Sequence, residues 1–223
     1  MLGESFDYTK DGVIGKMDRW LKLVIATIIL AIPLYGYVMR IYKGTKPAPE
    51  VDDWGRLFID GILLLIVSFI YAIPVLILEF LMLGSAGYAV AMSGDPSAAM
   101  TGMMGAGILF IVFIIVAIII GLLVPMAMVR FSRTGSFGEA FNFGAILGHI
   151  GKIGWVNYIV ALIIGAIVVG IPVMILWFIL IALMIAIPII GLVIAAVVFL
   201  AVIPLITVFQ TRYITQIYDT VAA

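Results

Sequence analysis

The chain has 223 residues, of which 65% are hydrophobic and 11% are charged, and its mean hydropathy is +1.34. Soluble domains are only about half apolar, so this composition indicates a protein whose solvent is lipid. The predicted fold class is all-α: a polytopic integral membrane helical bundle, forming one membrane domain over 1–223. The 12 basic and 12 acidic residues cancel, which argues against nucleic acid as a partner.

The residue types that catalysis and metal binding need are scarce. There is no cysteine and only one histidine, His149, which excludes disulfides and thiolate metal sites. The sequence contains no HExxH, P-loop or GxSxG motif. We therefore expect no enzyme, no cofactor and no metal. The acidic first twenty residues, with no small-residue cleavage site after them, favour an N-terminus that is kept rather than a signal peptide.

The first apolar run, Leu21–Met39, has basic residues on both sides and the pattern IPLYG, Ile32 to Gly36, at its centre. Two structures fit it. A run of about 19 residues is long enough to cross a bilayer, which would give five spans and an external N-terminus. Alternatively, the proline and glycine turn the chain into a shallow re-entrant hairpin, which would give four spans and two internal termini. Length favours the spanning helix.

Four further runs have the length and composition of transmembrane helices, which need about 20 residues at 1.5 Å each. They are approximately Leu57–Leu83, Gly105–Val129, Gly154–Ala186 and Gly191–Phe209. The third is longer than a perpendicular helix needs, so it must tilt, kink near Pro172 or project beyond the hydrocarbon. The pattern IPIIG, Ile187 to Gly191, predicts the turn between the last two spans.

The loops between the spans differ in charge. Basic residues occur in Arg40–Arg56 and in Arg130–Lys152, whereas the loop Gly84–Met104 has none. By the positive-inside rule, we expect loops 40–56 and 130–152 on the cytoplasmic side of the cell membrane and loop 84–104 outside it.

Two short segments beside the spans repeat a pattern. WGRLFIDG at Trp54–Gly61 and FGEAFNFG at Phe137–Gly144 both read aromatic, Gly, charged, aliphatic or Ala, Phe, two residues, Gly. The repetition predicts duplicated units of about 21–83 and 105–186, followed by a final span of about 191–211. Chance is the alternative in a chain this rich in glycine and phenylalanine.

Both segments have the pattern of helices that lie in the membrane interface. Phe137, Phe141 and Leu147 form one stripe at helical spacing, and Val51, Trp54 and Phe58 form another, with Asp52, Arg56 and Asp60 paired at i, i+4 opposite it. A collar of two such helices would dock a partner protein. The residues predicted for that site are Asp52, Asp53, Trp54, Arg56, Phe137 and Glu139, with His149 also facing outward. The alternative is plain interfacial anchoring.

Glu79 is the one acid clearly inside an apolar run, near the outer end of its span. Intramembrane acids are candidate ion or proton sites, although a residue one turn from the surface also reaches the interface. Small residues recur at i, i+4, as in Ala161 with Gly165 and Ala166 with Gly170. Such pairs let helix backbones approach within a bundle or between protomers.

Three blocks of the chain carry a family resemblance. They are GYVMRIYKGTKPAPEVDDWGRLFIDGILLLIVSFIYAIP at Gly36–Pro74, SFGEAFNFG at Ser136–Gly144, and the C-terminal block Ile187–Tyr218. Together they make the chain similar to the largely archaeal membrane-protein family grouped as domain of unknown function 4013. The resemblance implies a small multi-spanning helical protein and carries no catalytic residue over.

These patterns predict a non-enzymatic integral membrane protein, an accessory subunit or membrane-organising scaffold. The expected partners are membrane lipid and other membrane proteins or further copies of the chain. The alternative function is a small oligomeric transporter or channel that uses Glu79. The shortage of polar side chains inside the spans favours the scaffold.

Overall fold

The computed structural model describes residues 1–105 and 107–221, and every regular element within them is a helix. Four of the described helices are long and apolar enough to cross a membrane. The predicted all-α, polytopic class is therefore confirmed. The contacts divide the chain into two compact units. The first unit comprises Met1–Leu65 and the described residues from Met126 onward, and the second comprises Ile66–Pro125.

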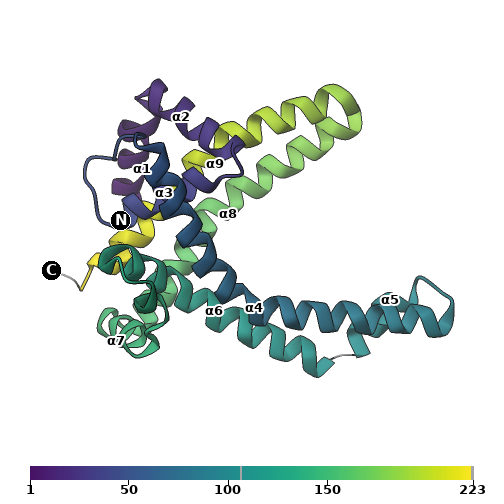
Figure 1. Ribbon diagram of the computed structural model, residues 1–223. Helices are drawn as coiled ribbons and strands as arrows, with labels where there is room; N and C mark the ends of the chain where they lie inside the picture. The colour runs from purple at the N-terminus through teal and green to yellow at the C-terminus, as the bar shows by residue number, and fades with distance from the viewer. Residues whose placement is uncertain (106, 222–223) are drawn as a thin grey trace. The chain divides into compact units, whose positions relative to one another are not determined.

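The first unit begins with the short helices α1 and η1, which precede α2 and α3, and it ends with the long helices α8 and α9 (Figure 1). Between them come the start of α4, the end of α6, and the short helices η2 and α7. The bounds are α1 Leu2–Thr9, η1 Lys10–Ile14, α2 Met17–Ile28, α3 Ile32–Tyr42, α4 Trp54–Ser93, α6 Gly107–Thr134, η2 Phe137–Phe141, α7 Phe143–Ile153, α8 Trp155–Ala186 and α9 Pro188–Asp219.

The helices α8 and α9 form an antiparallel hairpin and lie side by side (Figure 1). The predicted turn is confirmed: only Ile187 separates the helices, and Pro188 opens α9. At Ala161 and Gly165 the small residues make room for a side chain rather than for a second backbone, because the Tyr213 ring lies against Gly165 and its hydroxyl donates to the Ala161 carbonyl at 2.8 Å. In contrast, a Cβ at Gly170 would meet no described atom within 4 Å.

The first apolar run is not one helix, so the single spanning helix expected over Leu21–Met39 does not form. Helix α2 ends at Ile28, Leu30 and Ala31 have φ angles of 56° and 57°, and α3 starts a new axis at Ile32. The break has a physical cause, because Pro33 has no N–H to continue the ladder of an incoming helix. With 12 and 11 residues, the two helices are only about 18 Å and 17 Å long, too short to cross about 30 Å. The two helices contact each other across the break, and the re-entrant hairpin stays a prediction.

Helix α3 crosses the start of α4 through two glycines. A Cβ on Gly36 would overlap the backbone of Leu57, and one on Gly61 would overlap the carbonyl of Ile32. The contact is reciprocal. Gly36 meets Leu57, which lies one helical turn before Gly61, and Gly61 meets Ile32, which lies one helical turn before Gly36. It brings two backbones together as small residues do in membrane helices. Around it lies the core of this unit, which contains Val13, Leu23, Ala26, Leu34, Tyr37, Ile41, Val51, Leu57 and Val208.

The second unit contains the rest of α4, α5 (Ala98–Gly105) and α6 up to Pro125. The segment 84–104, expected as a loop, is mainly helical: α4 continues to Ser93 and α5 follows after a short turn. Gly102 fits against Ala89 and the backbone of Ser85, and the Ser85 hydroxyl lies 3.2 Å from the Gly102 carbonyl that accepts from it. Small residues therefore let α4 and α5 pack together beyond the most apolar part of α4.

The glycine crossing predicts a strong effect of a single methyl group. Gly36→Ala should lower the free energy of unfolding by about 1–3 kcal/mol, because the new Cβ would meet the Leu57 backbone, which cannot rotate away. Thermal unfolding of the purified protein in detergent, followed by circular dichroism, measures the change. Gly148→Ala is the control, since its Cβ would lie in open space on α7 and alanine favours a helix. Equal melting temperatures for the two variants would contradict the crossing.

Candidate functional site

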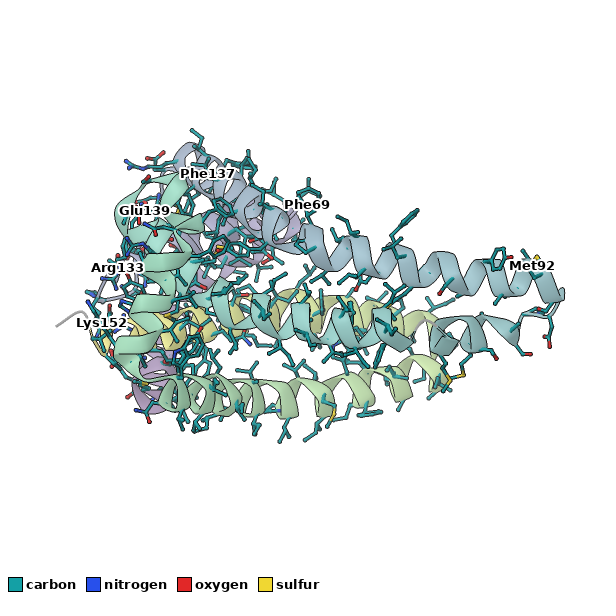
Figure 2. All side chains as sticks on the ribbon, turned by 90° about the horizontal axis from the view of Figure 1, so that it is seen from below. Phe69, Met92, Arg133, Phe137, Glu139 and Lys152 are labelled. Atoms are coloured by element: carbon teal, nitrogen blue, oxygen red, sulfur yellow. The ribbon has the colours of Figure 1, made fainter. Side chains whose placement is uncertain are left out.

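The collar consists of the segments Arg40–Arg56 and Arg130–Lys152, both in the first unit. Figure 2 shows Arg133, Glu139 and Lys152 in a region where nitrogen and oxygen atoms gather, whereas α8 carries almost only carbon. The polar chemistry of this unit is therefore concentrated beside the ends of its long helices.

The first collar segment has no separate interfacial helix, which corrects the prediction for the Trp54 stripe. Trp54 is the first residue of the continuous helix α4, and Val51 lies before it. Asp53, with a φ angle of 46°, ends the loop, and its Oδ1 accepts a hydrogen bond from the backbone N–H of Arg56 at 3.2 Å. This is the geometry of an N-cap, so Asp53 serves the start of the helix.

Arg40 closes the same segment onto the end of α3. Its Nη1 donates to Asp52 Oδ1 at 2.5 Å and to the Glu50 carbonyl at 3.0 Å, and its Nη2 donates to the Asp52 carbonyl at 2.9 Å. The predicted i, i+4 pairing of Asp52 with Arg56 is wrong, because Asp52 lies outside the helix. Asp60 lies 3.9 Å from the Lys43 ammonium instead.

The second collar segment folds back on the end of α6. Arg130 Nε donates to Glu139 Oε2 at 2.6 Å, and the Asn142 amide donates to the same carboxylate at 3.3 Å. These bonds, the one from Arg130 first, hold the pKa of Glu139 below its ordinary value. The Phe137 ring packs edge-on against Phe131 at a centroid distance of 6.1 Å. Phe137 and Glu139 thus fix the segment to α6, although both remain partly accessible.

The Phe137 stripe does not lie on one helix, which corrects a second expectation. Phe137 and Phe141 belong to the 3₁₀ helix η2, and Leu147 belongs to α7. Asn142 separates them, with its Oδ1 accepting from the backbone N–H of Ala145 at 3.1 Å as the cap of α7. Because η2 and the start of α4 differ in local structure, the repeated motif does not correspond to a repeated element here, and duplication stays a prediction.

Arg133 joins three helices and was not singled out as a site residue by the sequence. Its Nε donates to the Tyr42 carbonyl at 2.6 Å, and its Nη2 donates to Asp219 Oδ1 at 2.7 Å. The guanidinium also lies over the Tyr218 ring, with Cζ at 5.8 Å from the centroid. The ends of α3, α6 and α9 are therefore held by one side chain. Its only signal in the sequence was a positive charge in a loop.

His149 packs against the same C-terminal turn. Its ring stacks on Tyr218 at 3.9 Å, and Nε2 lies 2.9 Å from the Tyr218 carbonyl. A carbonyl only accepts, so Nε2 carries the proton and Nδ1 is the free base of the neutral ring. Burial lowers the pKa of His149 below its ordinary value of 6.5. His149 is therefore a half-buried packing residue rather than an outward-facing one.

Glu79, the candidate ion or proton site, is exposed on α4 in the second unit, and no described side chain pairs with it. The helix continues past it to Ser93, so it does not lie at the end of an element. Its role in transport stays a prediction. In the described part of the chain, no group of three or more His, Asp or Glu side chains is placed to hold a metal ion.

A second polar cluster, at the N-terminal segment, was not predicted. Arg212 of α9 is 1% exposed and donates from Nη2 to Glu4 Oε1 at 2.5 Å. Arg19 of α2 is 2% exposed, donates from Nη1 to the Gly12 carbonyl at 2.6 Å and pairs with Glu50. The nearest sequence signal was Arg212 itself, a basic residue just after the last apolar run.

The fold and the collar define the class of the protein: an all-α, multi-pass membrane protein with a polar layer beside its long apolar helices. The chain belongs to the family described as Protein of unknown function (DUF4013), whose model matches residues 21–181. The match includes both collar segments. It ends before α9 and begins after Glu4 and Arg19. No curated protein and no solved structure matches the chain.

The state of His149 predicts a pH dependence. The unfolded chain takes up the imidazole proton near pH 6.5, whereas the folded chain takes it up at lower pH, so the stabilisation is complete above 6.5 and is lost as the pH falls toward the folded pKa. Between about pH 7.5 and pH 5.5, the melting temperature should therefore fall more in the native sequence than in His149→Gln. Glutamine is the control because its amide can still donate to the Tyr218 carbonyl. Parallel profiles would show that His149 does not titrate in this range.

Proposed function

We propose that the protein is a non-enzymatic accessory subunit or membrane-organising scaffold whose collar docks a partner protein on the cytoplasmic side. The observation that supports this most is the internal pairing of the collar arginines. Arg40, Arg130 and Arg133 all donate to acceptors of the chain itself. Loops held in this way lose little conformational freedom on binding, which is the advantage of a preorganised surface.

The exposed part of the collar has the mixed character of a protein interface. On α7, Ile146 and Ile150 are buried, whereas Leu147 is 42% exposed. Arg56 and Lys152 are exposed and make no ion pair with a described residue. The acids Asp52 and Asp53 are exposed as well. Apolar surface edged by charges of both signs suits a protein better than an anionic membrane surface, which favours a uniformly basic face.

The orientation follows from the loop charges and can be measured directly. Because the chain has no cysteine, single cysteines can be introduced without background. In intact cells, an impermeant thiol reagent should label Asp95→Cys in the turn between α4 and α5 and leave Lys152→Cys unlabelled until the cells are opened. Both positions are exposed. Labelling of Lys152→Cys alone in intact cells would reverse the topology.

Charge reversal tests the docking surface. Arg56→Glu combined with Lys152→Glu should detach proteins that co-purify from mild detergent, with a fall in recovery of about tenfold, because each lost charge contact at an interface weakens binding by a factor of that order. Neither side chain holds a described ion pair, so the melting temperature should stay the same. Lys10→Glu with Lys22→Glu makes the same charge change outside the collar, with loss of the exposed Lys22–Asp18 ion pair, and should keep the partner. Equal recovery from both double variants would leave the collar as a membrane anchor.

A further inference from the structure

A groove runs along α8 and α9 of the first unit and is closed on its third side by the N-terminal segment. Its volume is about 320 Å³, and its lining is apolar except at Thr9. The Thr9 hydroxyl already donates to the Ser5 carbonyl at 2.9 Å. Phe6 and Ile14 complete the N-terminal wall. Because the lining offers a ligand almost only apolar surface, the part of a ligand that enters must be hydrocarbon.

A buried guanidinium lies beside one end of this groove. Phe209 lines the groove, and Arg212 follows three residues later, so the two side chains share a face of α9. Arg212 Nη2 donates to Glu4, but its Nε and Nη1 are buried without a hydrogen-bond partner in the described part of the chain. Buried N–H groups that lack an acceptor are costly. This end of the groove therefore favours an additional acceptor.

The charges around Arg212 point to the sign of that acceptor. Arg212 and Lys46 share the Glu4 carboxylate, while Arg19 and Lys16 share that of Glu50. Four cationic side chains thus share two carboxylates, which leaves two positive charges in excess. Arg19 Nε is also buried without a described partner. The ligand should therefore carry negative charge.

The two clusters meet at Tyr8. Its ring covers the Arg212 guanidinium, with Cζ at 5.0 Å from the centroid. Burial raises the pKa of Tyr8 to about 12, and the charges of Arg212 and Arg19 oppose that rise. The charges of both arginines therefore affect Tyr8. The next residue in the sequence, Thr9, lines the groove. The cationic cluster and the apolar groove therefore adjoin the same N-terminal segment.

The position of Arg212 along α9 matches the level of lipid headgroups. The apolar run of α9 ends at Phe209, so Arg212 lies about 4.5 Å further along the axis, at the rise of 1.5 Å per residue. Basic pockets between membrane helices at this level are typical binding sites for anionic headgroups.

We propose that this site binds an anionic phospholipid, with one acyl chain in the groove and the phosphate at Arg212 and Lys46. The Glu4 carboxylate occupies the position of the phosphate when no lipid is bound, and it is displaced when the lipid enters. A phosphate offers more acceptor atoms than a carboxylate, so it reaches Arg212 donors that Glu4 leaves unpaired. The collar takes no part in this site.

Lipid retention measured by native mass spectrometry tests the proposal. The purified full chain is titrated in detergent with phosphatidylglycerol or with phosphatidylcholine. The native sequence should retain phosphatidylglycerol in about tenfold preference, because both lipids offer a phosphate but the choline of phosphatidylcholine adds a positive charge that the cationic cluster repels. Lys46→Gln should lower the retention by a similar factor, and Glu4→Gln should raise it, because the internal competitor loses its charge.

Matched controls separate the site from general electrostatics. Asp7→Asn removes the same charge from α1, and Lys10→Gln removes a lysine of the same segment, but neither residue pairs with the described cluster. Both variants should behave like the native sequence. Val168→Trp should lower retention by filling the groove, whereas Val160→Trp, two turns away on α8, should not.

Several results would overturn the proposal. These are equal retention of the two lipids, equal gains from Glu4→Gln and Asp7→Asn, and equal retention by Val168→Trp and Val160→Trp. Displacement of the lipid by inorganic phosphate at the same concentration would also overturn it, since the cluster would then bind a free anion without using the groove.

Discussion

The guanidinium of Arg212 has almost no access to solvent, and the N-terminal segment lies against it and offsets its charge in part. A buried charge without a partner is among the most destabilising features that a fold can contain. Glu4 supplies a carboxylate from the other end of the sequence, and Gln216, one turn further along α9, donates to the Ser5 hydroxyl at 2.6 Å. These contacts bring α1 onto α9. The N-terminal segment is therefore part of the fold, and it gives the groove its third wall.

The glycine crossing sets the position of the collar in a comparable way. With Gly36 against Leu57 and Gly61 against Ile32, α3 and the start of α4 are closer than side chains with a Cβ would permit. The loop between them must then turn back over a short distance, and Arg40 at the end of α3 comes within reach of Asp52 just before α4. Close backbone packing and the ion pair support each other, since each restricts the same loop.

The parts of the fold that depend on composition alone were predictable from the sequence. The spans of α6, α8 and α9 follow from runs of apolar residues, because in lipid a single segment can form all its backbone hydrogen bonds internally only as a helix. The break at Leu30 and Ala31 was not decided by the sequence, since neither residue favours a left-handed conformation. The continuation of α4 to Ser93 was also missed. The apolar run was taken to end at Leu83, but the small side chains of Ser85 and Ala89 provide a packing surface for Gly102.

The site residues were harder to predict than the spans, because charge partners are distant in sequence. Asp52 was assigned to the wrong arginine because i, i+4 spacing was the only guide, and Arg133 was assigned no contact at all.

The same structure explains why the two polar clusters suit different ligands. In the collar, Arg40, Arg130 and Arg133 meet carboxylates and carbonyls of the chain, so what remains for binding is shape and exposed side chains. At the N-terminal segment, buried donors outnumber their acceptors beside an apolar groove. A protein surface fits the first arrangement, and a molecule with a phosphate and a hydrocarbon chain fits the second.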